Sequence, residues 1–246
     1  MIKFVVMCTR VIIATIVALL LTSCRYDIDL GNGIDGNGNV ITEKRIINES
    51  FTKIEVSRGI EVIVEQDSNT AIEVEADDNI IKHITTKVEN GVLVISTDES
   101  IDSAEAETVR VKTAVIKGLE ASSGSNISSK STLKGTNIAV KSSSGSEIEA
   151  TLEYDSVKSE STSGSEITLS GKTLKLQSHS SSGSEINASN LLVNDVIAEA
   201  SSGSSTTVNP LVSLNAKASS GSSINYRGTP KTISKEENSG GDVTKN

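Results

Sequence analysis

Residues 142–148 read SSSGSEI, and nearly the same seven letters return at residues 161–167 (STSGSEI) and 180–186 (SSSGSEI). Related Ser-Gly-Ser cores lie on both sides of these three. The six cores are centred on Gly124, Gly145, Gly164, Gly183, Gly203 and Gly221, at intervals of 21, 19, 19, 20 and 18 residues. A frayed seventh copy, NSGGDV, follows at residues 238–243. This period indicates a solenoid, in which each repeat forms one coil that stacks on the next.

The apolar residues of the repeats fall into columns when the copies are aligned on their central Gly. Three positions after the Gly stand Ile127, Ile148, Ile167, Ile186, Thr206 and Ile224. Five positions after it stand Ser129, Ala150, Leu169, Ala188, Val208 and Tyr226. Seven positions before it stand Lys117, Ile138, Val157, Leu176, Val196 and Leu214, and three before it stand Ala121, Ser142, Ser161, Ser180, Ala200 and Ala218. All these offsets are odd, so the columns share one face of a pleated strand.

Each repeat is therefore expected to be two short strands joined at a Ser-Gly-Ser corner, where Gly permits a positive φ. One coil cannot bury its own apolar face, but coils stacked at about 4.8 Å bury the columns together. The predicted fold class is all-β, a right-handed parallel β-helix (β-solenoid) of about six or seven coils, each of 18–21 residues. Leucine-rich repeats and calcium-binding nonapeptide repeats are excluded because their Leu-x-x-Leu-x-Leu and Gly-Gly-x-Gly-x-Asp signatures are absent.

An N-terminal β region precedes the repeats. Alternation begins after Phe51, with Ile54 and Val56 on one face of a strand and Glu55 on the other. This period of two is typical of strands with one face in water. Asn90-Gly91 is a hairpin-turn signal. We expect residues 43–246 to form a single β-solenoid domain, with the repeats starting at about residue 116.

The first 24 residues indicate export. A basic start is followed by the uncharged apolar run from Val11 to Leu21, which is too short to span a bilayer as a helix. Residues 21–24, LTSC, resemble the lipobox of bacterial lipoproteins. The resemblance implies a lipoprotein signal peptide over residues 1–23 and lipid attachment at Cys24, which would anchor the protein to a membrane. Residues 24–42 are rich in Gly, Asn and Asp, and are expected to be a flexible tether.

Composition excludes several classes of partner. The chain has 23 Lys and Arg against 32 Asp and Glu, and a net charge of −9 argues against nucleic acid. It has no Trp, three Tyr and two Phe, which argues against a conventional lectin groove built on aromatic rings. Its two Cys fall in the signal segment and the lipobox, so neither a disulfide nor a cysteine metal site is expected.

The sequence contains no catalytic pattern, and we expect a protein that is not an enzyme and needs no cofactor. His83 and His179 are the only histidines and are far apart in the chain, so neither a triad nor a histidine metal site is expected. Polysaccharide lyase activity is disfavoured because Asp and Arg are sparse in the repeats. The column of Glu147, Glu166 and Glu185 has two readings: a solvated face that keeps the rod soluble, or a weak calcium site.

The order of these features is similar to one family. FTKIEVSRGIEVIVEQ at residues 51–66, the SSGS repeats and the Tyr226-x-Gly228-x-Pro230 sequence resemble the head GIN domain family, described as putative auto-transporter adhesins. The resemblance implies a parallel β-helix and no known catalytic residues. The expected function is a non-enzymatic, lipid-anchored binding module of the cell envelope, in the outer membrane, contacting a surface glycan or an envelope protein and no small-molecule substrate. A structural or periplasmic scaffold that binds an envelope partner is the alternative.

Overall fold

The computed structural model describes residues 33–246, which form one compact unit made of strands, turns and loops without an α-helix. Its first strand starts at Ile34, nine residues before the expected domain boundary at residue 43. The expected signal peptide, residues 1–23, and Cys24 lie outside the described residues. Within residues 33–246, no helix is long and apolar enough to cross a lipid bilayer.

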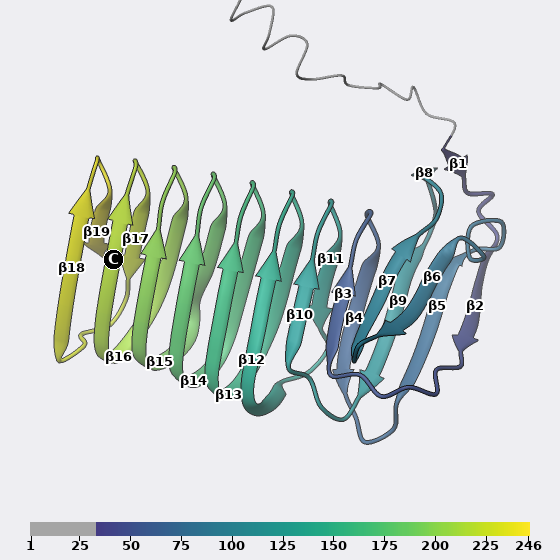
Figure 1. Ribbon diagram of the computed structural model, residues 1–246, viewed down its shortest axis with the longest axis horizontal. Coiled ribbons are helices and arrows are strands. Elements are labelled where there is room, and N and C mark those ends of the chain that lie inside the picture. Colours follow the sequence, from purple (N-terminus) through teal and green to yellow (C-terminus); the bar gives the residue numbers. More distant parts are fainter. Residues whose placement is uncertain (1–32) are drawn as a thin grey trace, which may run out of the picture. The chain divides into compact units, whose positions relative to one another are not determined.

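The repeats form a parallel β-solenoid, as predicted, with successive coils side by side (Figure 1). Its strands are β10 (Gly118–Ala121), β11 (Asn126–Ser129), β12 (Leu133–Ser142), β13 (Glu147–Ser161), β14 (Glu166–Ser180), β15 (Glu185–Ala200), β16 (Ser205–Ser219), β17 (Ser223–Tyr226), β18 (Thr232–Asn238) and β19 (Asp242–Lys245). The register pairs Ile148 with Ile167 and Ile167 with Ile186. All three side chains are 0% exposed, so they form one continuous column inside the solenoid.

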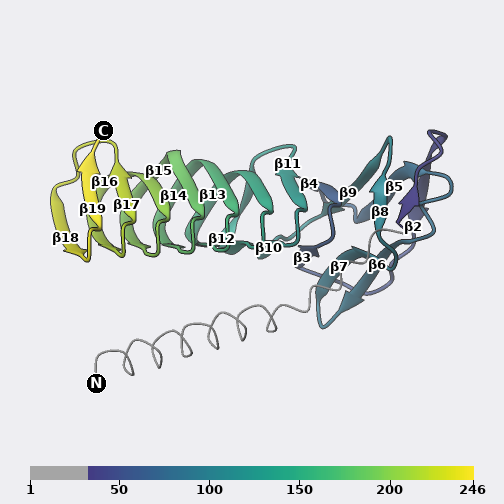
Figure 2. The same ribbon diagram turned by 90° about the horizontal axis from the view of Figure 1, so that it is seen from above.

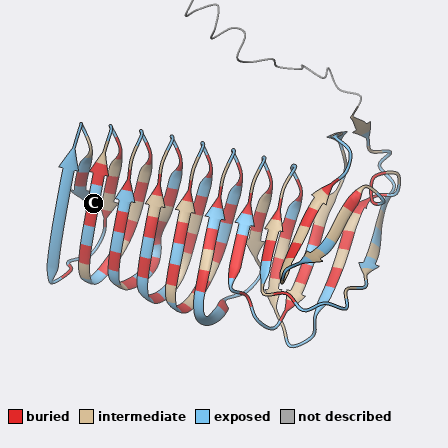
Figure 3. Cartoon of the chain, viewed as in Figure 1, coloured by how far each residue is buried: buried red, intermediate tan, exposed pale blue. Residues whose placement is uncertain are grey.

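Buried and exposed residues alternate along every inner coil, which gives the banded pattern of Figure 3. Nearly all of the predicted inward columns are buried. Lys117 is an exception and is exposed, because the chain enters β10 only at Gly118 and the preceding Ile116 is buried instead. The core is therefore aliphatic over most of the solenoid, and buried Ser side chains line it beside the Ser-Gly corners.

The tight corners are two-residue turns in which both central residues have positive φ. At Ser144-Gly145, for example, φ is 54° and 70°, and the N–H of Ser146 donates to the carbonyl of Ser143 at 3.3 Å. Seven Ser-Gly pairs have this conformation, so the structure places a non-glycine residue in the left-handed region at every one of these corners. From the sequence, positive φ was expected only at Gly. The N–H of each turn Gly from Gly124 to Gly221 donates to a carbonyl in the turn of the next coil at 3.1–3.2 Å, and these bonds link the corners in a ladder.

At the first six of these corners, the Ser that follows the turn Gly points inward and is buried. Ser146 Oγ lies 2.8 Å from the carbonyl oxygen of Ala121 in the preceding coil, and Ser165 Oγ lies 2.8 Å from that of Ser142. The Oγ of Ser142 also lies 2.8 Å from that of Ser146. These contacts show that the Ser hydroxyls at the turns bond to the neighbouring coil, which offsets the cost of burying them, whereas the buried hydroxyls of Ser159 and Ser178 have no hydrogen-bond partner within residues 33–246.

The second corner of each coil differs from the prediction. Strands β13 to β16 have 15 or 16 residues and continue through a bend, so an inner coil is not two short separate strands. Within the solenoid coils, register shifts occur only near this bend, for example between Asn187 and Leu192 of β15. The unequal repeat lengths are therefore absorbed at the second corner, while the Ser-Gly corners stay aligned.

The solenoid begins earlier in the chain than expected. Strands β3 (Lys53–Val56) and β4 (Glu61–Gln66) form a coil that pairs directly with β10 and β11. Its corner is Arg58-Gly59, with φ of 64° and 81°, and Val56 and Val62 occupy the inward positions three before and three after the Gly. The prediction that repeats start near residue 116 missed this coil because Arg stands in place of Ser.

Residues 67–117 are an insertion that closes the N-terminal end. Its strands are β5 (Ala71–Asp77), β6 (Ile84–Glu89), β7 (Val92–Thr97), β8 (Ile101–Ser103) and β9 (Glu107–Thr113). Strand β7 continues one wall beside β3 and pairs with β6, whereas β9 continues the other wall beside β4 and pairs with β5. The β6–β7 hairpin turns at Asn90-Gly91, as predicted. Figure 2 shows these two walls diverging at this end.

Residues 33–42, which the sequence analysis placed in a flexible tether, are ordered against the insertion. Strand β1 (Ile34–Asp35) pairs with β8, and β2 (Val40–Arg45) pairs antiparallel with β5. The buried carboxylate of Asp77 accepts the N–H of Gly38 at 2.9 Å, and Asn39 donates to Asp78 at 2.8 Å. Hydrogen bonds from Asn39 and Asn37 lower the pKa of Asp78. Asn and Asp here bond to a partner segment of the chain.

The coil formed by β18 and β19 has charges at inward positions. Lys235 is in register with Ala216, and Glu237 is in register with Ala218. The Lys235 Nζ donates to the carbonyl of Val243 at 2.6 Å and lies 5.0 Å from the centre of the Tyr226 ring. Glu237 accepts the N–H of Val243 at 2.9 Å. These bonds satisfy backbone groups of the coil and cover the apolar interior with polar atoms.

Because Tyr154 is buried, the fold is expected to lose stability at alkaline pH. Its side chain is 4% exposed, its hydroxyl donates to the carbonyl of Ile116 at 2.8 Å, and burial raises its pKa to about 12. An unfolded Tyr ionises near pH 10, so the contribution is present below pH 10 and is lost between about pH 10 and 12. We expect a loss of about 2 kcal/mol across that window.

Urea denaturation at pH 9 to 12 measures this effect, with Tyr154→Phe as the control. The variant lacks the ionisable hydroxyl, so its unfolding free energy should fall less across the window than that of the unchanged protein. Equal alkaline losses in the two proteins would show that Tyr154 is not responsible.

Candidate binding surface

The outer wall of the solenoid presents columns of side chains in register. Four positions before each turn Gly, acidic and basic residue types alternate from coil to coil: Glu120, Lys141, Glu160, His179, Glu199, Lys217 and Glu236. Lys217 Nζ lies 2.9 Å from Glu236 Oε1, and Lys141 Nζ lies 3.6 Å from Glu160 Oε2. The hydrogen bond with Glu236 raises the pKa of Lys217, and the same contact lowers the pKa of Glu236. The alternation was readable in the sequence but was not recognised.

The predicted acidic column also forms. Glu147 pairs with Glu166 and Glu166 with Glu185, and all three side chains are exposed. Over residues 33–246, no group of three or more His, Cys, Asp or Glu side chains is positioned to hold a metal ion. The solvated-face reading accounts for this geometry, and calcium binding to the column stays an untested hypothesis.

The two histidines lie in different parts of the molecule. His83 Nδ1 lies 2.9 Å from Asp98 Oδ1 beside the β6–β7 hairpin, whereas His179 Nδ1 on β14 lies 3.7 Å from Glu199 Oε2. Each histidine therefore has its own carboxylate neighbour, and the two do not share a site.

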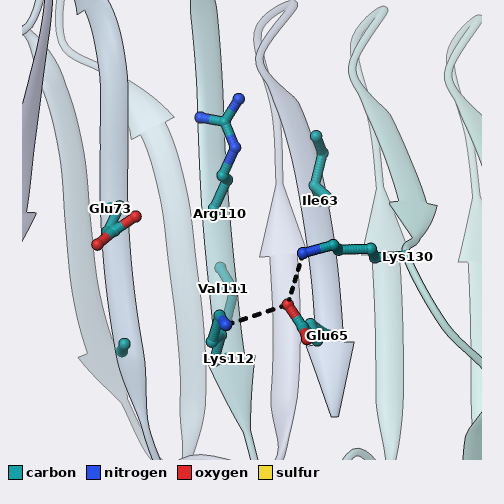
Figure 4. A pocket seen from close by; sticks show the side chains of 8 residues that line it. Ile63, Glu65, Glu73, Arg110, Val111, Lys112 and Lys130 are labelled. Carbon is teal, nitrogen blue, oxygen red and sulfur yellow. Dashed lines mark hydrogen bonds and ion pairs between the residues drawn. The ribbon is translucent and has the colours of Figure 1, made fainter. Parts of the chain in front are cut away.

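A groove opens on the outer face of the sheet where the solenoid meets the insertion (Figure 4). Its volume is about 430 Å³. The lining residues are Ile63 and Glu65 of β4, Ala71 and Glu73 of β5, Arg110, Val111 and Lys112 of β9, and Lys130 just after β11. Because successive side chains of a strand point to opposite faces, the charged side chains of these strands point outward. The apolar side chains of Ile63 and Ala71 lie among them.

The charges of the groove are arranged around Glu65. Lys112 Nζ lies 3.2 Å and Lys130 Nζ 3.1 Å from the same carboxylate oxygen, Oε2. These two lysines lower the pKa of Glu65. Arg110 forms an ion pair with Glu75 beside the groove. Glu75 balances Arg110 and Lys44 balances Glu73, which leaves Lys112 and Lys130 against the single carboxylate of Glu65, a local positive excess on a chain whose net charge is −9.

Sequence reasoning did not identify this groove, because its residues come from four chain segments. Arg110 and Lys112 were visible as outward residues between buried valines, but the strand order that places them beside Glu65 and Lys130 was not. Their neighbours depend on the insertion, whose β9 pairs with β4 on one side and β5 on the other.

A second cavity of about 490 Å³ lies where the chain enters the repeats, beside Gln66, Lys117, Lys134 and Tyr154. The amide of Gln66 bridges two segments there: its Nε2 donates to the carbonyls of Ala114 and Lys134 at 2.9 and 3.0 Å, and its Oε1 accepts the N–H of Lys134 at 2.7 Å. The polar groups of this cavity are used to join chain segments, so the groove around Glu65 is the better candidate for a ligand.

Several solved structures share this fold. A putative adhesin from Bacteroides fragilis matches with a TM-score of 0.81 and 21% identity, over 87% of this chain and 100% of that one. A putative lipid binding protein from Parabacteroides distasonis matches with a TM-score of 0.70 and 19% identity, over 87% and 99% of the two chains. A putative adhesin from Parabacteroides merdae matches with a TM-score of 0.67 and 20% identity, over 88% and 100%. At these identities the likeness shows the fold alone.

No curated protein sequence matches the chain. A family model does match, over residues 50–230, which include the coil of β3 and β4, the insertion and the Ser-Gly coils as far as Pro230. The family resemblance noted in the sequence is thereby confirmed: the chain belongs to the family of putative auto-transporter adhesins with a head GIN domain.

Proposed function

We propose that this chain is a lipid-anchored, non-enzymatic binding protein of the cell envelope, which contacts a surface glycan or an envelope protein through the outer wall of its solenoid. One observation carries the proposal: the wall repeats outward side chains coil after coil, as in the column of Glu147, Glu166 and Glu185. Solenoids use such extended surfaces for binding. Membership of a family of putative adhesins supports the same conclusion.

The proposed anchor is tested at its cysteine. Cys24→Ser is expected to abolish incorporation of labelled palmitate and to release the protein from the membrane fraction. Cys8→Ser is the matched control, because Cys8 lies within the proposed signal segment and should leave labelling unchanged. A Cys24→Ser protein that still carries the label would contradict the proposed anchor.

The proposed exposure to external surfaces is tested by protease treatment of intact cells. We expect proteinase K to degrade the protein on intact cells while a periplasmic marker survives. Full protection in intact cells, with digestion after the outer membrane is opened, would reject an external adhesin. That result would favour the alternative function, a periplasmic scaffold that binds an envelope partner.

A further inference from the structure

We propose that the groove lined by β4, β5, β9 and Lys130 binds a carboxylate-bearing sugar unit. The inference rests on the proposed binding function and names the site and ligand class for it. Three features of the groove support this inference. It has an excess of positive charge on an acidic protein, its volume suits a small ligand, and its strands have no unpaired edge.

The positive excess is concentrated between two side chains. Lys112 and Lys130 both contact one oxygen of Glu65, at 3.2 and 3.1 Å. A Lys ammonium has three N–H donors, so each retains donors after bonding to Glu65. A ligand carboxylate that approached both ammonium groups from the solvent side would accept charge-assisted hydrogen bonds from both. The groove thus has the donors for a second carboxylate beside its own.

The size of the groove fits a small ligand rather than a bare ion. Its volume of about 430 Å³ lies within the range of small-molecule pockets. Ile63 and Ala71 are the apolar side chains that the lining exposes, and they can pack against the C–H face of a sugar ring, whereas the Val111 side chain is buried in the core. None of the lining residues is aromatic, so ring stacking is unavailable and charge must provide much of the affinity.

The strand pairing favours a sugar over an acidic peptide. A peptide commonly binds a sheet by adding a strand to an exposed edge. Strand β4 is paired with β9 and β11, and β5 is paired with β2 and β9. Every strand beneath the groove therefore has both edges occupied, and recognition must use side chains.

The test is an NMR titration of the protein from residue 25 onward, without the lipid anchor. The probes are glucuronate, galacturonate and N-acetylneuraminate, with the uncharged methyl ester of each sugar, inorganic phosphate and a hexaglutamate peptide as comparisons. We expect at least one acidic sugar to shift the amide signals of β4 and β9, while its methyl ester and phosphate at equal concentration do not.

Two variants with opposite expected effects on affinity distinguish a role of the groove residues in ligand binding from a role in stability. Lys112→Gln combined with Lys130→Gln should weaken binding about tenfold, because two charge-assisted bonds are lost. Glu65→Gln should strengthen binding about threefold, because both ammonium groups lose their internal partner.

Matched controls come from ion pairs outside the groove. Glu153 also contacts two lysines, Lys134 at 3.1 Å and Lys172 at 2.9 Å, so Glu153→Gln should leave binding unchanged. Lys172→Gln combined with Lys217→Gln makes the same change in net charge as the groove variant and should also leave it unchanged.

Each result that contradicts the proposal rejects a different part of it. No shift with any acidic sugar, or equal weakening by the control lysine pair, would overturn the site. Equal binding of phosphate would reduce it to a simple anion site, and binding of hexaglutamate alone would replace the sugar with a peptide. If the groove fails while intact cells still expose the protein to protease, the site is rejected and the proposed surface function is retained.

Discussion

Ile167→Ala is expected to lower the free energy of unfolding by about 3 to 4 kcal/mol, because it removes buried methylene and methyl groups from the middle of the core. Ile167 is 0% exposed and lies in register between Ile148 and Ile186, so the cavity would open between two coils that cannot move apart without breaking their backbone ladder. Urea denaturation followed by circular dichroism measures the loss.

The control is the adjacent outward residue. Glu166→Ala changes an exposed side chain of the same strand and should alter stability by less than about 0.5 kcal/mol. Hydrogen exchange adds a local readout, since protection of the amides of Ile148 and Ile186 should fall in Ile167→Ala. Similar losses in the two variants would contradict the inward column on which the fold depends.

Gly171→Ala is expected to cost about 3 to 5 kcal/mol, because it combines backbone strain with a collision. Gly171 has a φ of 105°, and a Cβ built there would lie 2.2 Å from the carbonyl oxygen of Leu152. Leu152 belongs to β13, whose ladder with β14 holds that oxygen in place. The same denaturation measurement tests this variant.

Gly164→Ala separates strain from collision. Gly164 also has a positive φ, 69°, but a Cβ there would meet no atom within 4 Å. It should therefore cost only the left-handed penalty, about 1 to 2 kcal/mol. If Gly171→Ala proves no worse than Gly164→Ala, the close approach of β13 to Gly171 is contradicted.

The repeats were predictable because one physical rule fixed their arrangement. Apolar residues at odd offsets from the turn Gly had to share a face, and only stacking could bury that face. The columns around Ile167 followed from this rule. The coil of β3 and β4 has the same inward offsets around Gly59. It lacks the Ser-Gly-Ser motif, because Arg58 precedes the Gly, and so the motif did not reveal it.

Other features could not be deduced from local patterns. The second corner carries no turn motif; its bend is accommodated by register shifts and by Gly171, an isolated strand Gly that signals close backbone approach. Residues 33–42 read as spacer because Asn and Asp favour both solvent and specific hydrogen bonds, and their partners at Asp77 and Asp78 are about 40 residues away. The groove likewise depends on strand order within the insertion.

The charged inward residues of the β18–β19 coil affect how the rod can grow. A second molecule that stacked on this coil would enclose Lys235 and Glu237 in a dry, aliphatic interior, at a cost of several kcal/mol per ion. Polymerisation through this tip is therefore disfavoured, as with inward charges at other sheet edges. Inner coils face no such restriction. Duplication of one Ser-Gly repeat would lengthen the rod by about 4.8 Å and leave both ends unchanged, so evolution can adjust reach without redesigning the termini.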